Sequence, residues 1–87
     1  MKTSPAVESH SLLRWVFGHG THALTCAVNA NGVGAFDVCI MPHWNLSSSI
    51  VERCTSAASA FERHAEISAR LRRKGWVVVK YAATHRF

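Results

Sequence analysis

The chain has 87 residues, of which 48% are hydrophobic and 17% are charged, a balance typical of ordered globular proteins and sufficient for a single domain. No run reaches the roughly 18 to 20 apolar residues that a membrane-spanning helix needs, so the sequence predicts no such helix. The formal net charge of +5 permits attraction to a polyanion but specifies neither fold nor partner. The core of so short a chain is thin, which makes self-association a reasonable expectation.

Residues 1–10 are polar, contain Pro5 and show no periodicity, so we expect a flexible N-terminal arm. This stretch lacks the unbroken apolar segment of a secretory signal. The cysteines, Cys26, Cys39 and Cys54, are odd in number and have no CxxC spacing, which favours reduced thiols over a disulfide framework. We therefore expect a cytoplasmic protein.

Three strands are predicted in the first half of the chain. Leu12–Phe17 is aromatic and β-branched and ends at a glycine-rich turn. The runs 22–29 and 35–41 are also strand-like, and the Asn31-Gly32 pair between them is a strong hairpin signal.

The register of this hairpin can be predicted from its apolar residues, because a shift of one residue turns every side chain to the other face. A two-residue loop at Asn31-Gly32 would set Ala27 opposite Phe36 and scatter apolar side chains over both faces. A three-residue loop collects six apolar side chains on one face, and we expect this register. Its pairs are Leu24 with Ile40, Cys26 with Val38, and Val28 with Phe36.

A long helix is predicted after the third strand, which Pro42 should end because proline donates no ladder hydrogen bond. Ser49 and Glu52 have the spacing of a capping box, and apolar residues recur with a helical period through Ile50–Lys74. Gly75 suits the left-handed position that follows a helix.

The last predicted element is a strand at Trp76–Ala82, followed by a polar tail at 83–87. The sequence thus predicts one α+β domain over 11–82. Its expected order is β-β-β-α-β, with a small, mainly antiparallel four-stranded sheet and one long helix packed on one face. The order of the strands within the sheet is not specified by the sequence.

A single helix covers only one face of such a sheet, so the other face should remain open to a partner. We therefore expect a small non-enzymatic interaction domain that forms a homo-oligomer through the open face. The residues expected to make this contact are Val16, Ala23, Met41, Trp76 and Val78.

The alternative hypothesis is a nucleic-acid-binding regulator that uses the basic end of the helix. In this reading, cations contact phosphates and one tryptophan stacks on a base. Cations also gather at helix C-termini because they stabilise the helix dipole there, so the pattern does not by itself establish binding. The residues concerned are Arg14, Arg70, Arg72, Arg73, Lys74, Trp76 and Lys80.

No catalytic or cofactor motif of the GxSxG, HExxH, P-loop or GxGxxG type occurs, so we expect neither an enzyme nor a bound cofactor or small-molecule substrate. A zinc site made by His19, His22 and His43 stays conceivable from the spacing. Cys54 and His64 would lie about 15 Å apart along the predicted helix, too far for a catalytic dyad. We expect His64 to be a hydrogen-bonded core or interface residue.

Overall fold

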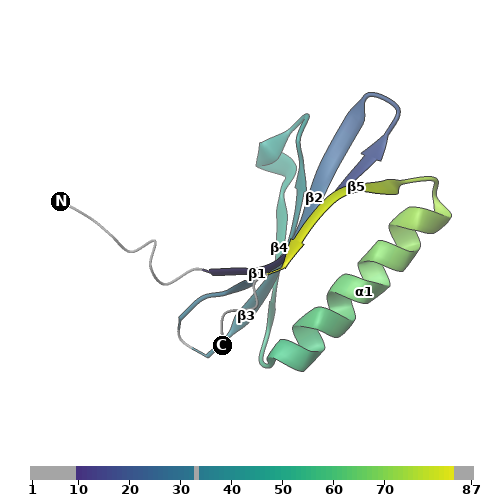
Figure 1. Cartoon of the computed structure of the whole chain (residues 1–87). Coiled ribbons are helices and arrows are strands. Elements are labelled where there is room, and N and C mark those ends of the chain that lie inside the picture. Colours follow the sequence, from purple (N-terminus) through teal and green to yellow (C-terminus); the bar gives the residue numbers. More distant parts are fainter. Residues whose placement is uncertain (1–9, 33, 84–87) are drawn as a thin grey trace.

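The computed structural model describes residues 10–32 and 34–83 as an α+β fold, in which one α-helix lies across one face of an antiparallel sheet (Figure 1). The sheet has five strands in the order β4-β3-β2-β1-β5. In chain order the elements are β1 (His10–His19), β2 (His22–Ala30), β3 (Phe36–Pro42), the 3₁₀ helix η2 (Leu46–Ser48), β4 (Ile50–Cys54), α1 (Ala57–Arg73) and β5 (Val77–Ala83).

The prediction of an α+β fold is confirmed, but the prediction of four strands is wrong. The segment expected to begin the helix, Ile50–Cys54, forms the edge strand β4 instead. Pairing with β3 sets Arg53 opposite Asp37, and the guanidinium Nε donates to a carboxylate oxygen at 3.0 Å. On the other face Glu52 receives two hydrogen bonds from Arg63 of α1. These tertiary contacts override a helical pattern that Ile50 and Cys54 share with the true helix.

The helix therefore begins later than predicted. Its N-cap is Ser56, whose hydroxyl accepts a hydrogen bond from the backbone N–H of Ser59 at 3.1 Å. The expected capping box is absent, because Ser49 donates its hydroxyl to the carbonyl of Leu46 and so closes η2.

The C-terminus of α1 ends as the sequence predicts. Gly75 adopts a φ of +96°, and its N–H bonds to the carbonyl of Arg72 while the N–H of Trp76 bonds to that of Leu71. This is the Schellman pattern, which turns the chain back over the helix end. Trp76 is thereby held beside the sheet.

The β2–β3 hairpin has the predicted faces but a different register. Val28 lies opposite Val38 and Cys26 opposite Ile40, a shift of two residues from the expected pairs. Because side chains alternate with period two, this shift preserves the face of each residue. The loop is longer than expected, and Asn31 closes it by bonding through its backbone N–H and its side-chain oxygen to Ala35.

Two β-bulges interrupt the pairing of β1 with its neighbours. Leu12 is the extra residue against β2, and Val79 is the extra residue of β5 against β1. The second bulge changes which side chains of β5 face the helix: Trp76 and Val78 pack against the core. The expectation that these two residues lie on the open face is therefore wrong.

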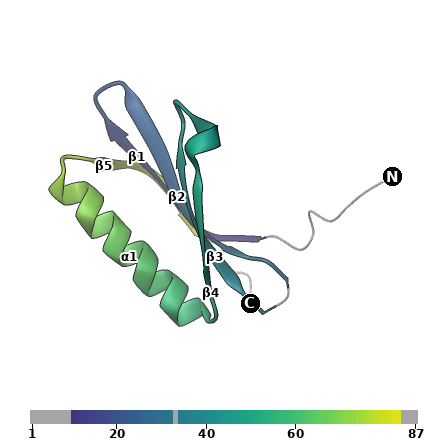
Figure 2. The ribbon, with the colours of Figure 1, turned by 180° about the vertical axis from the view of Figure 1, so that it is seen from behind.

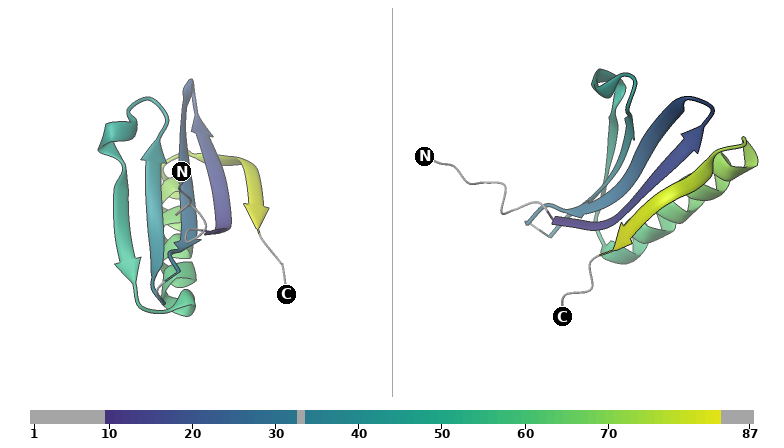
Figure 3. Two further views of the ribbon diagram at one scale, coloured as in Figure 1. Left: turned by 90° about the vertical axis from the view of Figure 1, so that its left-hand side faces the viewer. Right: turned by 45° about the horizontal axis from the view of Figure 1, so that its top comes forward.

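The core lies between α1 and the sheet (Figure 2), and its buried sheet residues come from β1, β2 and β3. Its buried apolar members are Phe17, Leu24, Cys26, Val28, Val38, Ala60 and Ile67. Strand β5 stands to one side of the helix (Figure 3). The predicted arm at 1–10 and tail at 83–87 lie outside the described residues, except that His10 begins β1 and Ala83 ends β5.

Candidate functional site

The open face of the sheet is less exposed than the sequence suggests. Val16, Ala23 and Met41 do lie on it, but all three are half-buried. Thr25 at its centre is only 1% exposed, and His43 lies over it with Nε2 2.7 Å from the threonine hydroxyl. The centre of this face is thus well covered, whereas Val51 and Val77, toward its two edges, are more than half exposed.

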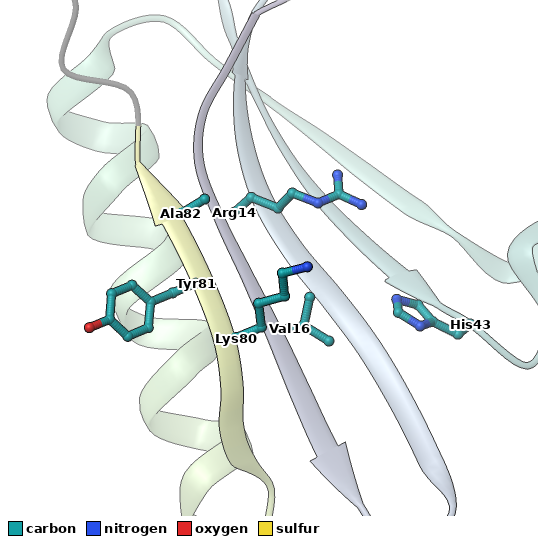
Figure 4. A pocket seen from close by; sticks show the side chains of 6 residues that line it. All are labelled: Arg14, Val16, His43, Lys80, Tyr81 and Ala82. Carbon is teal, nitrogen blue, oxygen red and sulfur yellow. The ribbon is translucent and has the colours of Figure 1, made fainter.

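A shallow pocket of about 320 Å³ opens on this face near β5. Its basic residues are Arg14 of β1 and Lys80 of β5, whose side chains point to the same side of the sheet (Figure 4). The ring of Tyr81 points to the opposite side of β5. The remaining lining residues are Val16, His43 and Ala82.

The cations of the predicted nucleic-acid-binding set do not form one surface. Arg14 and Lys80 belong to the open sheet face, whereas Arg72, Arg73 and Lys74 lie at the C-terminus of α1, on the covered side. Arg70 also lies on α1, and its charge adds to the hydrogen bond from Arg63 that chiefly lowers the pKa of the Glu52 carboxyl. The sequence therefore grouped residues that the fold divides between two faces.

Most of the carboxylates lie away from the C-terminal end of α1. Arg53 pairs with Asp37, and Arg63 pairs with both Glu52 and Glu66. The hydrogen bonds from Arg63 are the main reason that the pKa of Glu52 lies below its ordinary value. Three of the four carboxylates within the described ranges are thus engaged in ion pairs near β3, β4 and the middle of α1.

Four aromatic rings meet at one end of the sheet, a cluster that we call the aromatic tip and define as His19, His22, Trp44 and Trp76. The two tryptophans stack with ring centroids 6.1 Å apart and planes 19° apart. His22 meets Trp44 edge-on at 4.8 Å, and His19 contacts Trp76 at 5.3 Å. Sequence reasoning missed this cluster, because its members come from three separate turns.

Most of the exposed large apolar side chains lie on the edge strands of the sheet. On β5, Val77 is 57% exposed, Val79 is 60% exposed and Tyr81 is 73% exposed. On β4, Ile50 is 53% exposed and Val51 is 60% exposed. These edges, which the sequence did not single out, are the apolar surfaces that a partner could cover.

His64 and Cys26 are buried and contribute to the core. The ring of His64 donates from Nε2 to the backbone carbonyl of Cys26 at 3.1 Å, which confirms the prediction of a hydrogen-bonded core histidine. Burial raises the pKa of the Cys26 thiol to about 12, and an unionised thiol is a poor nucleophile. Cys54 lies on β4, so the two residues weighed as a dyad do not share a helix.

The histidines weighed as zinc ligands are separated by the fold. His19 and His22 belong to the aromatic tip, whereas His43 is bonded to Thr25 on the open face. Across residues 10–32 and 34–83, the structure brings together no group of three or more His, Cys, Asp or Glu side chains that could hold a metal ion.

Comparison with protein-family models, with curated proteins and with solved structures finds no match. Within the part of the chain that the structure describes, no helix has the length and apolar character needed to cross a membrane.

Proposed function

We propose that the chain is a small non-enzymatic interaction domain that self-associates by pairing β5 with β5 of a second copy. The observation that supports this most is the exposure of an apolar edge strand. Val77, Val79 and Tyr81 are all more than half exposed, although each would be favoured at a covered position.

The sequence of β5 is that of a strand covered on both faces. Val77–Ala83 reads VVVKYAA, with a single charge at Lys80. Strands with one solvated face normally alternate between apolar and polar residues, whereas nearly continuous apolar runs belong to strands buried on both sides. A single copy leaves the outer part of β5 uncovered, because α1 packs on β2, β3 and β4.

The free edge of β5 has limited protection against pairing, namely the charge of Lys80 and the bulge at Val79. Among the described residues β5 pairs only with β1, so its outer edge presents a row of backbone N–H and C=O groups. The opposite edge differs: β4 has five residues, and Glu52 and Arg53 place charges in its middle. Short length and charge are the features that block pairing at a natural sheet edge.

A second copy is the partner that fits this edge without further assumptions. A two-fold axis sets β5 antiparallel to itself, and residues directly opposite must then share a face. Val78 packs toward the core and Tyr81 lies opposite Trp15 on the same side, so Val78 should face Tyr81 of the second copy. In this register Lys80 faces Val79, and the two lysines are not directly opposed.

Sedimentation equilibrium over a range of concentrations tests the proposal. Val79→Lys places an ammonium group at the centre of the proposed pair, and we expect it to raise the dissociation constant by at least about ten-fold, since an uncompensated charge there costs more than about 1.4 kcal/mol. Val51→Lys on β4 is a matched control, because both valines are 60% exposed. The control should associate like the wild type.

Two results would overturn the proposal. One is a monomeric mass for the wild type at several hundred micromolar. The other is dissociation by Val51→Lys as large as that by Val79→Lys. Met41→Lys separates the edge from the open face, because only an interface over that face would be disrupted by this substitution.

We also propose that the protein works in the cytoplasm. None of its three cysteines is in a disulfide, and Cys26 and Cys39 are buried among the strands. Such thiols suit a reducing compartment. Fractionation of cells that express the tagged chain tests this, and recovery in an oxidising compartment would contradict it.

A further inference from the structure

The aromatic tip is assembled by three turns that the sequence keeps far apart. The β1–β2 turn carries His19 and His22, which lie opposite each other as the last pair of the ladder. The Schellman turn after α1 delivers Trp76. Trp44 comes from the loop after β3, where the N–H of His43 extends the sheet by bonding to the carbonyl of Ala23 at 2.9 Å.

Packing against the core explains the position of Trp76 but not the exposed position of Trp44. Trp76 is half-buried and contacts the core cluster, so it has a structural role. Trp44 is 54% exposed and contacts only Trp76 and His22 among the described rings. It therefore keeps about half of its surface in water while its ring packs against Trp76 and His22.

Positive charge lies next to this surface. Arg72, Arg73 and Lys74 immediately precede the turn that delivers Trp76, and all three are exposed. Within the described ranges none of them makes an ion pair. Three of the four described carboxylates are engaged in ion pairs near β3, β4 and the middle of α1, so the last turn of α1 keeps a positive potential.

We propose that the aromatic tip and the adjacent end of α1 bind single-stranded nucleic acid. An unstacked base would lie on the exposed face of Trp44, and the phosphates on either side would contact Arg72, Arg73 and Lys74. Aromatic platforms next to basic grooves are the means by which proteins bind single strands without reading sequence. A duplex does not offer unstacked bases, so it should bind more weakly. This activity is separate from self-association and does not depend on it.

Fluorescence anisotropy with labelled RNA and DNA of about 12 nucleotides at about 50 mM salt tests the proposal. Trp44→Ala should weaken binding by roughly ten- to a hundred-fold, the usual effect of losing one stacked base, while Trp44→Phe should recover most of it. Leu46→Ala is a matched control, because Leu46 begins η2 two residues after Trp44 and is 65% exposed. It should bind like the wild type.

The contribution of charge can be measured by salt dependence. The double substitution Arg72→Gln and Arg73→Gln should weaken binding and reduce the slope of log affinity against log salt by about 1.4, since each phosphate contact on a single strand contributes about 0.7. Neutralising Arg14 and Lys80 together removes the same charge from the other face. These two substitutions should leave the slope nearly unchanged.

Each other outcome overturns the proposal. Equal binding of the duplex, or wild-type affinity of Trp44→Ala with an unchanged unfolding midpoint, would show that no base stacks on the tip. An equal loss in both double variants would indicate attraction to net charge alone. Absence of any anisotropy change at low salt would exclude the site altogether.

Discussion

Replacing His64 tests the structure most directly, because one side chain links the helix to the centre of the sheet. His64 is 2% exposed, and its ring meets Trp15 edge-on at 5.1 Å. A carbonyl can only accept, so Nε2 carries the proton that bonds to Cys26. Nδ1 of the neutral ring is then left to accept from the Ser68 hydroxyl, 3.5 Å away.

Burial lowers the pKa of His64 below its ordinary value of 6.5. In the unfolded chain this ring takes up a proton near pH 6.5, whereas the folded protein does so only at lower pH. The stability that depends on the neutral ring is therefore fully present above pH 6.5 and is lost as the pH falls toward the folded pKa. One proton sets an upper limit on this loss of about 1.4 kcal/mol per pH unit.

His64→Gln should remove most of this pH dependence, because an amide can still donate to the Cys26 carbonyl but does not titrate. Urea unfolding followed by tryptophan fluorescence at pH 7.5 and 5.5 gives the measurement. We expect the wild type to lose up to about 1.4 kcal/mol more than the variant between these values. His64→Ala should cost about 2 to 4 kcal/mol at both pH values, through the lost hydrogen bond and the cavity.

Parallel pH curves for the wild type and His64→Gln would refute this account of the core. The carboxylate that bonds to α1 does not confuse the comparison, because the pKa of Glu52 is lowered from 4.5 and the group stays ionised throughout this window. A difference between the two proteins can then be assigned to the buried imidazole.

Three further predictions concern the core and the helix ends. Iodoacetamide should label the half-exposed Cys54 in the folded protein, whereas Cys26, with its raised pKa, should react only on unfolding, as mass spectrometry of the labelled chain would show. Glu52→Gln should cost about 0.5 to 1 kcal/mol at pH 7, and this cost should vanish in urea titrations as the pH falls through the lowered pKa of the carboxyl. Gly75→Ala should lower the thermal midpoint, because a Cβ there would lie 3.0 Å from Nε2 of His19 on a backbone with φ of +96°; an unchanged midpoint would contradict this.

The helix was predictable where its own residues decide its limits. Gly75 and the cations before it indicate the C-terminus correctly, because a Schellman turn needs only local chemistry. The N-terminus was misplaced because Ile50 and Cys54 fit the spacing of the helix stripe. What makes them a strand is pairing with β3 and the bonds of Arg53 and Glu52, which join residues distant in sequence.

The faces of the sheet were predictable only up to the bulges. Alternation correctly places Cys26 and Val28 toward the helix, since any even shift of register preserves it. A bulge adds one residue to one strand, and no composition signal marks Val79 as that residue. This is why the predicted contact set put Trp76 and Val78 on the wrong side of β5.

The position of β5 in the chain determines where pairing of two copies would place their aromatic tips. Trp76 immediately precedes β5, so antiparallel pairing of two β5 strands puts the two aromatic tips at opposite ends of the paired strands. In the register that sets Val78 opposite Tyr81, the two copies of Trp76 are offset by seven residues, or roughly 23 Å along the strands. A single strand long enough to reach both tips should bind more tightly than a short one, because its second contact is intramolecular. Val79→Lys should abolish this gain with length while leaving the affinity for short strands unchanged, since it separates the copies without altering the rings or cations of either tip.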